Sequence, residues 1–178
     1  MEFEDVVVSL PPDPQHLVEI WTDGGCKPNP GPGGWAAIMV FRGVEREMSG
    51  FDKDTTNNRM ELTAAASALE ALKRPCQVRV YTDSEYLKNG ITRWHQGWVR
   101  KNWRNASGDP VKNMDLWQRI LDVCKIHQVE WQWIRSHIGI PLNERADRLA
   151  TAAREDGLAA MGPGGGNQGR KPKASAAS

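Results

Sequence analysis

Apolar and polar residues alternate with a two-residue period in the first third of the chain, which is typical of β-strands. Three such stretches follow one another: LVEIWT (17–22), GWAAIMVFR (34–42) and VEREMSGF (44–51). Gly43 falls in the tight turn between the second and the third stretch. We therefore expect three consecutive antiparallel strands.

After Thr56 the period lengthens, and apolar residues recur at spacings of three and four: Leu62, Ala65, Leu69 and Leu72. This pattern predicts an amphipathic helix of about 18 residues. The segments QVRVYT (77–82) and VEWQWI (129–134) again read as strands. Shorter helical patterns cover residues 85–88, 115–127 and about 143–154.

This order of elements predicts an α/β fold with one mixed sheet of five strands. We expect three antiparallel strands followed by two parallel ones, with helices on both faces. A chain of 178 residues with 39% hydrophobic content suits one domain. We place that domain at residues 16–156, between a flexible, proline-containing leader (1–15) and a disordered tail (157–178) that is rich in glycine and polar residues.

Composition excludes several classes of protein. Lys and Arg total 23 against 22 for Asp and Glu, so the net charge of +1 indicates no particular partner. Three cysteines without a CxxC pair favour a reducing compartment over a disulfide framework. The acidic N-terminal segment resembles neither a signal peptide nor a transit peptide, and no apolar run approaches transmembrane length. We expect a cytoplasmic protein without membrane contact.

Two of the predicted strands end alike, in WTD at Asp23 and in YTD at Asp83. If the strands are parallel neighbours joined by a right-handed crossover, their carboxyl ends meet at the same edge of the sheet. Side chains alternate along a strand, so Asp23 shares a face with Trp21, and Asp83 shares a face with Tyr81. The pattern places both acids on one face.

The connecting helix supplies a third acid, because Glu61 lies four residues before Ala65 on the apolar stripe. Asp147 borders the apolar stripe of the last helix. Taken singly, an Asp after a strand is commonly a turn residue, and Glu61 would also suit the first turn of a helix. These alternatives stay open for each acid taken alone.

A cluster of carboxylates requires neutralisation. Two charges 4 Å apart repel by roughly 4 kcal/mol at an effective dielectric constant near 20, against a total domain stability of about 5 to 15 kcal/mol. An all-oxygen ligand set favours Mg²⁺ or Mn²⁺ over zinc. Two such ions about 4 Å apart are suited to the hydrolysis of a phosphodiester.

Five blocks carry a family resemblance: TDGGCKPNPGPGGW (22–35), TTNNRMEL (55–62), YTDSEY (81–86), PVKNMDLW (110–117) and SHIGIPLNERADRLA (136–150). With these blocks in order from Leu17 to about Glu155, the sequence closely resembles ribonuclease HI, the type 1 ribonuclease H. The resemblance implies a ribonuclease H-like fold. It also implies an endonuclease that cuts the RNA strand of RNA–DNA hybrids, leaving 5′-phosphate and 3′-hydroxyl ends.

Further roles follow from this resemblance. The metal-binding carboxylates are Asp23, Glu61, Asp83 and Asp147, which hold two Mg²⁺ ions, with Mn²⁺ as a substitute. His137 matches the catalytic-loop histidine, which shuttles protons or helps to release product. Taken alone, a histidine between a strand and a helix is more commonly structural. We expect a monomer whose partner is the hybrid.

The resemblance also assigns substrate contacts. Asn29, Asn57 and Asn58 match positions that contact the hybrid across its minor groove, and Thr56 and Asn113 match part of a DNA-phosphate pocket. The complete expected set is Cys26, Asn29, Thr56, Asn57, Asn58, Glu85, Trp98, Arg100, Lys101, Trp103, Arg104 and Asn113.

Residues 88–112 carry six basic side chains and one acid, interleaved with three tryptophans. This composition suits a groove that follows a nucleic-acid backbone, and it matches the family's basic protrusion, which grips the DNA strand. The alternative is a solvated helical hairpin with its tryptophans in the core, where we place Trp94. Two residues depart from close relatives: Asp54 stands at a position that some relatives fill with a basic residue, and Glu85 stands for a glutamine. Either would weaken hybrid binding or alter metal affinity.

Two other functions compete with hybrid cleavage. A non-catalytic module that binds RNA–DNA hybrids would be expected to lack one of the acidic ligands, and all four are present. A related metal-dependent exonuclease or resolvase would share the acids, but the basic stretch and the TTNNRMEL block argue against it.

Overall fold

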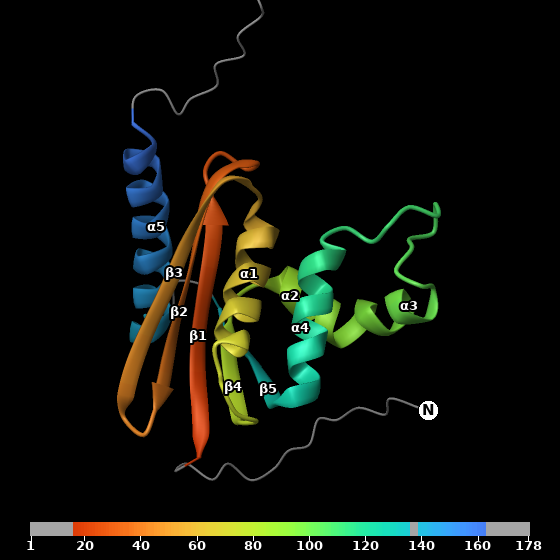
Figure 1. Ribbon diagram of the computed structural model, residues 1–178, viewed down its shortest axis with the longest axis horizontal. Coiled ribbons are helices and arrows are strands. Elements are labelled where there is room, and N and C mark those ends of the chain that lie inside the picture. Colours follow the sequence, from red (N-terminus) through yellow and green to blue (C-terminus); the bar gives the residue numbers. More distant parts are fainter. Residues whose placement is uncertain (1–15, 136–138, 163–178) are drawn as a thin grey trace, which may run out of the picture.

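The computed structural model describes residues 16–135 and 139–162, and a five-stranded mixed sheet forms its centre (Figure 1). The strand order is β3-β2-β1-β4-β5. Strands β1, β2 and β3 are antiparallel, whereas β4 and β5 run parallel to β1, as predicted. The strands are β1 (Leu17–Cys26), β2 (Gly31–Phe41), β3 (Val44–Thr55), β4 (Gln77–Thr82) and β5 (Gln128–Trp133).

The turn between β2 and β3 lies where the sequence predicted it. Arg42 and Gly43 both have positive φ, at 51° and 75°, and Phe41 pairs with Val44. Two central residues of positive φ define the two-residue hairpin whose twist matches that of the flanking strands.

Helices cover both faces of the sheet, also as predicted. Figure 1 shows α5 on one side and α1 with α4 on the other, while α3 lies farther from the sheet, beyond α4. The helices are α1 (Asn57–Glu70), α2 (Glu85–Asn89), the π-helical turn η1 (Gly90–Trp94), α3 (His95–Arg100), α4 (Met114–Ile126) and α5 (Pro141–Met161). Among the described residues, no helix has both the length and the apolar character needed to cross a membrane.

The core forms on either side of α1. Ala64, Ala65, Ala66 and Ala68 are completely buried, so the helix lies close to the sheet. One hydrophobic cluster fills the space between α1 and strands β1 and β4. A second joins α1 to α2 and α4 around Trp117, which is fully buried.

Two helix ends differ from the predictions. Helix α1 has 14 residues rather than about 18, because the Leu72 N–H bonds to the Leu69 carbonyl in a tightened last turn ahead of Pro75. Helix α5 continues to Met161, so residues 157–161, which we assigned to the tail, are helical. The Gly157 backbone lies so close to the Phe51 ring that a Cβ there would be 2.1 Å from it. The leader (1–15) and the rest of the tail (163–178) lie outside the described residues.

We predict opposite effects for alanine at two glycines of the η1–α3 segment. A Cβ on Gly90 would lie 1.9 Å from the Trp117 ring, whereas one on Gly97 meets nothing within 4 Å. Gly90→Ala should lower the free energy of unfolding by about 1 to 3 kcal/mol through overpacking. Gly97→Ala should be neutral or raise it by up to about 1 kcal/mol. Urea denaturation measures both, and equal stability of the two variants would contradict this packing.

Candidate active site

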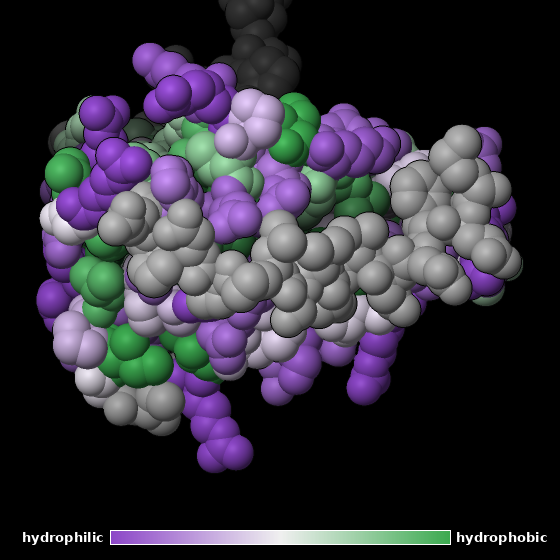
Figure 2. All heavy atoms as spheres, turned by 90° about the horizontal axis from the view of Figure 1, so that it is seen from below, coloured by the Kyte–Doolittle hydropathy of each residue, from purple (hydrophilic) through white to green (hydrophobic). Residues whose placement is uncertain are grey.

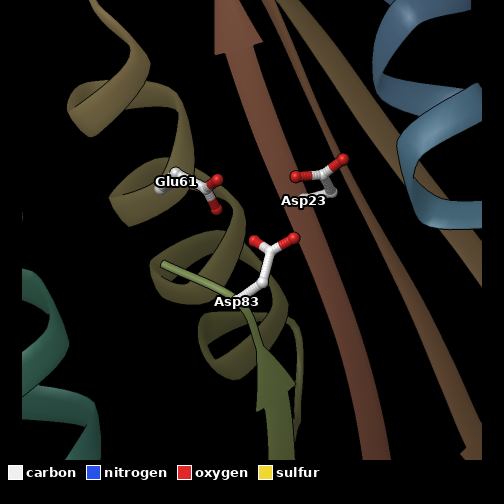
Figure 3. A group of neighbouring side chains, drawn as sticks. All are labelled: Asp23, Glu61 and Asp83. Carbon is white, nitrogen blue, oxygen red and sulfur yellow. The ribbon is translucent and has the colours of Figure 1, made fainter. Parts of the chain in front are cut away.

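Three acids converge where β1 and β4 stop pairing (Figure 3). Asp23 comes from β1, Glu61 from α1, and Asp83 follows the end of β4; their carboxylates point toward one another. One oxygen from each lies within 4.8 Å of the other two. The last paired residues of the two strands are Trp21 and Tyr81, whose rings stack at a centroid distance of 3.7 Å. Both acids therefore follow the stacked pair, as strand alternation predicted.

A close backbone approach brings Glu61 to this point. A Cβ on Gly24 would lie 2.5 Å from the Met60 carbonyl carbon and 2.8 Å from the Glu61 nitrogen. Only glycine allows helix and strand to come this close. The helix begins at Thr56, whose hydroxyl accepts a hydrogen bond from the Arg59 N–H at 3.2 Å. This cap and the glycine together fix the first turns of α1 against β1.

The environment of Asp23 favours its neutral form. Burial makes the largest contribution, followed by a hydrogen bond with the Asp147 side chain and the charge of Asp83; together they raise the pKa of Asp23 to about 8. The Gly24 N–H donates to Asp23 at 2.9 Å and opposes this rise. Asp147 extends from α5, so the fourth predicted acid reaches the same site.

Glu61 is more strongly affected. Burial, and then the charges of Asp23 and Asp83, raise its pKa well above the ordinary value. Its Oε2 atom is buried and has no hydrogen-bond partner in the described part of the chain. A buried carboxylate oxygen without a donor is costly, and a cation would satisfy it. The ligands are all carboxylates, which fits a hard divalent ion such as Mg²⁺ or Mn²⁺ rather than zinc.

The acids line a polar cleft of about 440 Å³. Its walls are Asp23, Gly24, Asn57, Asn58, Glu61, Asp83, Ser84, Glu85, Tyr86, Asn143, Glu144 and Asp147. Three of the predicted substrate residues, Asn57, Asn58 and Glu85, lie in this wall. Tyr86, Asn143 and Glu144 were not predicted. Asn143 and Glu144 lie one helical turn before Asp147 on α5. This spacing places them beside Asp147 and could have predicted their position in the cleft.

Hydrogen bonds join the β1–β2 connection to the start of α1. The Cys26 N–H donates to the Asn57 side chain at 2.8 Å, and the Asn57 N–H donates to the Asn29 side chain at 3.3 Å. The Cys26 thiol also lies 3.3 Å from the Asn29 oxygen. The structure therefore brings three predicted substrate residues into one exposed cluster.

Arg59 links Thr56 to Asn113. The Arg59 N–H donates to the Thr56 hydroxyl. The Arg59 guanidinium donates to the Asn113 side chain at 3.2 Å and to both oxygens of Asp115 at 3.0 and 2.8 Å. Asn113 in turn donates to the Tyr86 hydroxyl at 3.1 Å. The two predicted phosphate-pocket residues thus share one arginine, which the sequence reasoning did not single out. Asp54 is exposed, and its N–H donates to Asp52 at 3.0 Å.

The basic segment from α3 to Lys112 rests on tryptophans. Trp98 and Trp103 are half-buried, and the Trp98 ring lies 5.1 Å from that of Trp117. Placing Trp94 in the core was wrong: it is 38% exposed, with its ring at the edge of this group, 6.0 Å from that of Trp98. The side chains of Arg100, Lys101 and Arg104 are exposed. The cationic groups therefore face solvent on a hydrophobic base.

One predicted catalytic residue lies outside the part of the chain that the structure describes. His137 belongs to residues 136–138, which lie outside the described residues. Its role stays a prediction from the sequence. The flanking elements are β5, which ends at Trp133, and α5, which begins at Pro141.

Comparison with known proteins identifies relatives of this chain. A family model described as RNase H matches residues 15–155. Ribonuclease H of Granulibacter bethesdensis is 71% identical over 142 residues, which is 80% of this chain and 95% of that protein. Ribonuclease H of Acidiphilium cryptum is 71% identical over 143 residues, covering 80% and 89%.

Solved structures agree with these matches. LC9-RNase H1, a type 1 RNase H with the type 2 active-site motif, is 31% identical and superposes with a TM-score of 0.71 over 80% of this chain and 74% of that chain. LC11-RNase H1, solved in complex with an RNA/DNA hybrid, is 26% identical, with a TM-score of 0.61 over 79% and 99%. The likeness therefore includes sequence, fold and the region of the acids.

We predict that Asp23→Asn stabilises the metal-free protein. Since folding raises the pKa of Asp23 from 3.8 to about 8, the folded protein retains a proton that the unfolded chain releases. The associated stability is fully present below pH 3.8 and is lost as the pH rises through about 8. The asparagine of the variant does not ionise, so the variant keeps this stability at high pH. Its melting temperature at pH 8 should therefore exceed that of the parent by roughly 3 to 6 °C.

Thermal unfolding with a chelator present, followed from low to high pH, measures this difference. Asp122→Asn is the matched control, because the Asp122 side chain is 72% exposed and lies outside the cleft. A marked fall in the melting temperature of Asp23→Asn would show that the acid supports the fold instead.

Proposed function

This chain belongs to the ribonuclease H family, and we propose on that basis that it is an endonuclease that hydrolyses the RNA strand of RNA–DNA hybrids. The observation that carries the proposal is the convergence of Asp23, Glu61 and Asp83 within 4.8 Å, with a buried oxygen on Glu61 that has no hydrogen-bond partner among the described residues. Such a group is unfavourable without a cation and suits the chemistry of phosphodiester hydrolysis.

Dependence on a divalent metal follows from the family and from these acids. We infer that Asp23, Glu61, Asp83 and Asp147 hold two Mg²⁺ ions, which Mn²⁺ can replace. When bound, such ions activate the attacking water and stabilise the leaving oxygen of the phosphodiester. The contribution of the protein is to hold the acids close together against their repulsion.

The remaining roles concern the proton and the substrate. His137 accepts or returns a proton, or helps to release product, and so completes the catalytic set. Cleavage leaves a 5′-phosphate and a 3′-hydroxyl. Asn29, Asn57 and Asn58, with Cys26 and Glu85 beside them, contact the hybrid near the cut, where a 2′-hydroxyl distinguishes RNA from DNA. Gly25 leaves the backbone accessible there, whereas the space beside Gly24 is filled by the backbone of α1.

The DNA strand contacts a second surface. Thr56 and Asn113, joined through Arg59, bind a phosphate, while Arg100, Lys101 and Arg104 follow the backbone further away, with Trp98 and Trp103 beneath them. The exposed acids Asp54 and Glu85 moderate the attraction for the hybrid. We place the ribonuclease H domain at residues 16–156, with the final turn of α5 packed on it, and we expect a cytoplasmic monomer without membrane contact.

A non-catalytic hybrid-binding module is the alternative function. It would have no need of an acid whose buried oxygen has no donor within residues 16–135 and 139–162, and all four carboxylates are present. The proposal is therefore tested by turnover rather than by binding alone.

We predict that the protein cleaves the RNA strand of a labelled hybrid in Mg²⁺ and leaves duplex DNA and duplex RNA intact. Asp23→Asn should lower the rate by at least about 1,000-fold, since a metal ligand is lost, while hybrid binding persists. Gel analysis of the products measures both the specificity and the ends. Equal cutting of all three duplexes, or binding without cleavage by the parent protein, would reject the proposed function.

We also predict that Arg100, Lys101 and Arg104 set the salt dependence of hybrid binding. Replacing all three with alanine should weaken binding and flatten the slope of log K against log salt by about 0.9 for each lost phosphate contact. Fluorescence anisotropy across a salt series measures the slope. The matched control replaces Arg42, Arg46 and Lys125, which lie outside this segment, and its slope should equal that of the parent. Equal slopes for all three proteins would exclude the segment from the interface.

A further inference from the structure

An apolar groove of about 290 Å³ lies at the end of the sheet opposite the acids. The acids follow the end of β4, whereas the groove adjoins the segment that leads into β4. Its lining is Leu69, Glu70, Leu72, Lys73, Arg74, Pro75, Val123, Ile126 and His127. Leu69 and Val123 are buried beneath it, but Ile126 is 56% exposed, which is unusual for an isoleucine.

The rim of this groove is positively charged. Lys73 and Arg74 are exposed and have no ion-pair partner within residues 16–135 and 139–162. The one acid of the lining, Glu70, accepts two hydrogen bonds from Arg119, at 2.7 and 3.1 Å, which compensate its charge. An apolar floor between uncompensated cations suits a ligand that combines apolar and acidic side chains.

The floor is preformed by backbone hydrogen bonds. His127 is only 5% exposed, and its Nδ1 accepts a hydrogen bond from the Cys76 N–H at 3.1 Å. The Gln128 N–H donates to the Cys76 carbonyl at 2.9 Å. These bonds join the chain before β4 to the chain before β5, so the groove does not have to be assembled when a ligand arrives.

The first strand starts beside this groove. Leu17 pairs with Gln77, which pairs with Gln128, so the start of β1 lies two strand spacings, about 10 Å, from the residue after His127. Figure 2 views the molecule from below, the end at which β1 begins in Figure 1, and shows hydrophobic surface next to hydrophilic surface. A segment preceding β1 needs only a few residues to reach the groove, since an extended chain advances about 3.3 Å per residue.

The segment before β1 has the required chemistry. Residues 1–15 contain no lysine or arginine, and EFEDVVVSL (2–10) joins three acids to five apolar side chains. We propose that residues 2–10 dock in this groove of their own chain. The apolar side chains cover Leu72 and Ile126, and the acids lie beside Lys73 and Arg74.

Docking within one chain needs little intrinsic affinity. A short tether holds the segment at an effective concentration of about 1 mM, so a free-peptide dissociation constant near 0.1 mM gives about 90% occupancy. The occupied groove hides Ile126 and excludes other acidic, apolar peptides. The acids of the catalytic cleft follow the opposite end of β4, so hybrid cleavage should not change.

Competition with a labelled peptide of residues 1–15 tests the proposal on the full chain. In the variant Glu4→Lys/Asp5→Lys, repulsion from Lys73 and Arg74 keeps the leader out of the groove. This variant should therefore bind the peptide about 10-fold more tightly than the parent, whose groove is occupied by its own leader. Adding Lys73→Glu/Arg74→Glu to that variant should abolish binding of this peptide. A peptide carrying the two lysines should bind Lys73→Glu/Arg74→Glu instead. Lys53→Glu/Arg148→Glu, outside the groove, is the control and should behave as the parent.

Three outcomes would overturn the proposal. Equal peptide binding by the parent and by Glu4→Lys/Asp5→Lys would show that the leader does not occupy the groove. Failure of the reversed peptide to bind the reversed groove would show that charge does not pair them. Dimers that grow with concentration and vanish in Glu4→Lys/Asp5→Lys would place the leader in a second copy. Cleavage of the hybrid is measured in parallel, so loss of the proposed function is seen separately from loss of docking.

Discussion

The contact between Gly24 and the backbone of Met60 and Glu61 is the constraint on which the catalytic cleft depends. Without a side chain at Gly24, α1 can lie against β1 closely enough for Glu61 to reach Asp23. Electrostatic repulsion opposes this close approach, which brings carboxylates together and buries an oxygen of Glu61 that has no donor in the part of the chain that the structure describes. The alanine-rich face of α1, completely buried against the sheet and α4, holds the helix in place despite this repulsion.

The same helix also organises the proposed nucleic-acid surface. Its first turn carries the Thr56 cap and Asn57, which receives the Cys26 N–H, while Arg59 extends to Asn113 and Asp115 ahead of and within α4. A change in the position of α1 would therefore move the acids and the proposed hybrid contacts together. The basic segment is attached differently, through the packing of Trp98 on Trp117 in the second core cluster. In this segment the aromatic side chains pack against the core cluster, and the charged side chains remain exposed to solvent.

The two ends of the sheet have different tasks. The carboxyl ends of β1 and β4 bear the acids, as expected where parallel strands open a crevice. At the opposite end, the start of β1 lies beside an apolar groove with a basic rim. The docking that we propose for the leader therefore leaves the cleft accessible to the hybrid.

The sequence by itself determined the five strands, four of the helices, their order and the identity of three acids, because strand alternation and helical stripes are local properties. It did not predict η1 and α3. Asp23 and Asp83 could be paired by parity, and Glu61 could be recognised as a charge on an apolar stripe. Only the tertiary structure decided that Arg59 joins Asn113, since the two are 54 residues apart, that Trp94 lies outside the core, and that α5 continues past residue 156 to pack on Phe51. These features depend on which surfaces meet after folding, and local periodicity carries no information about distant partners.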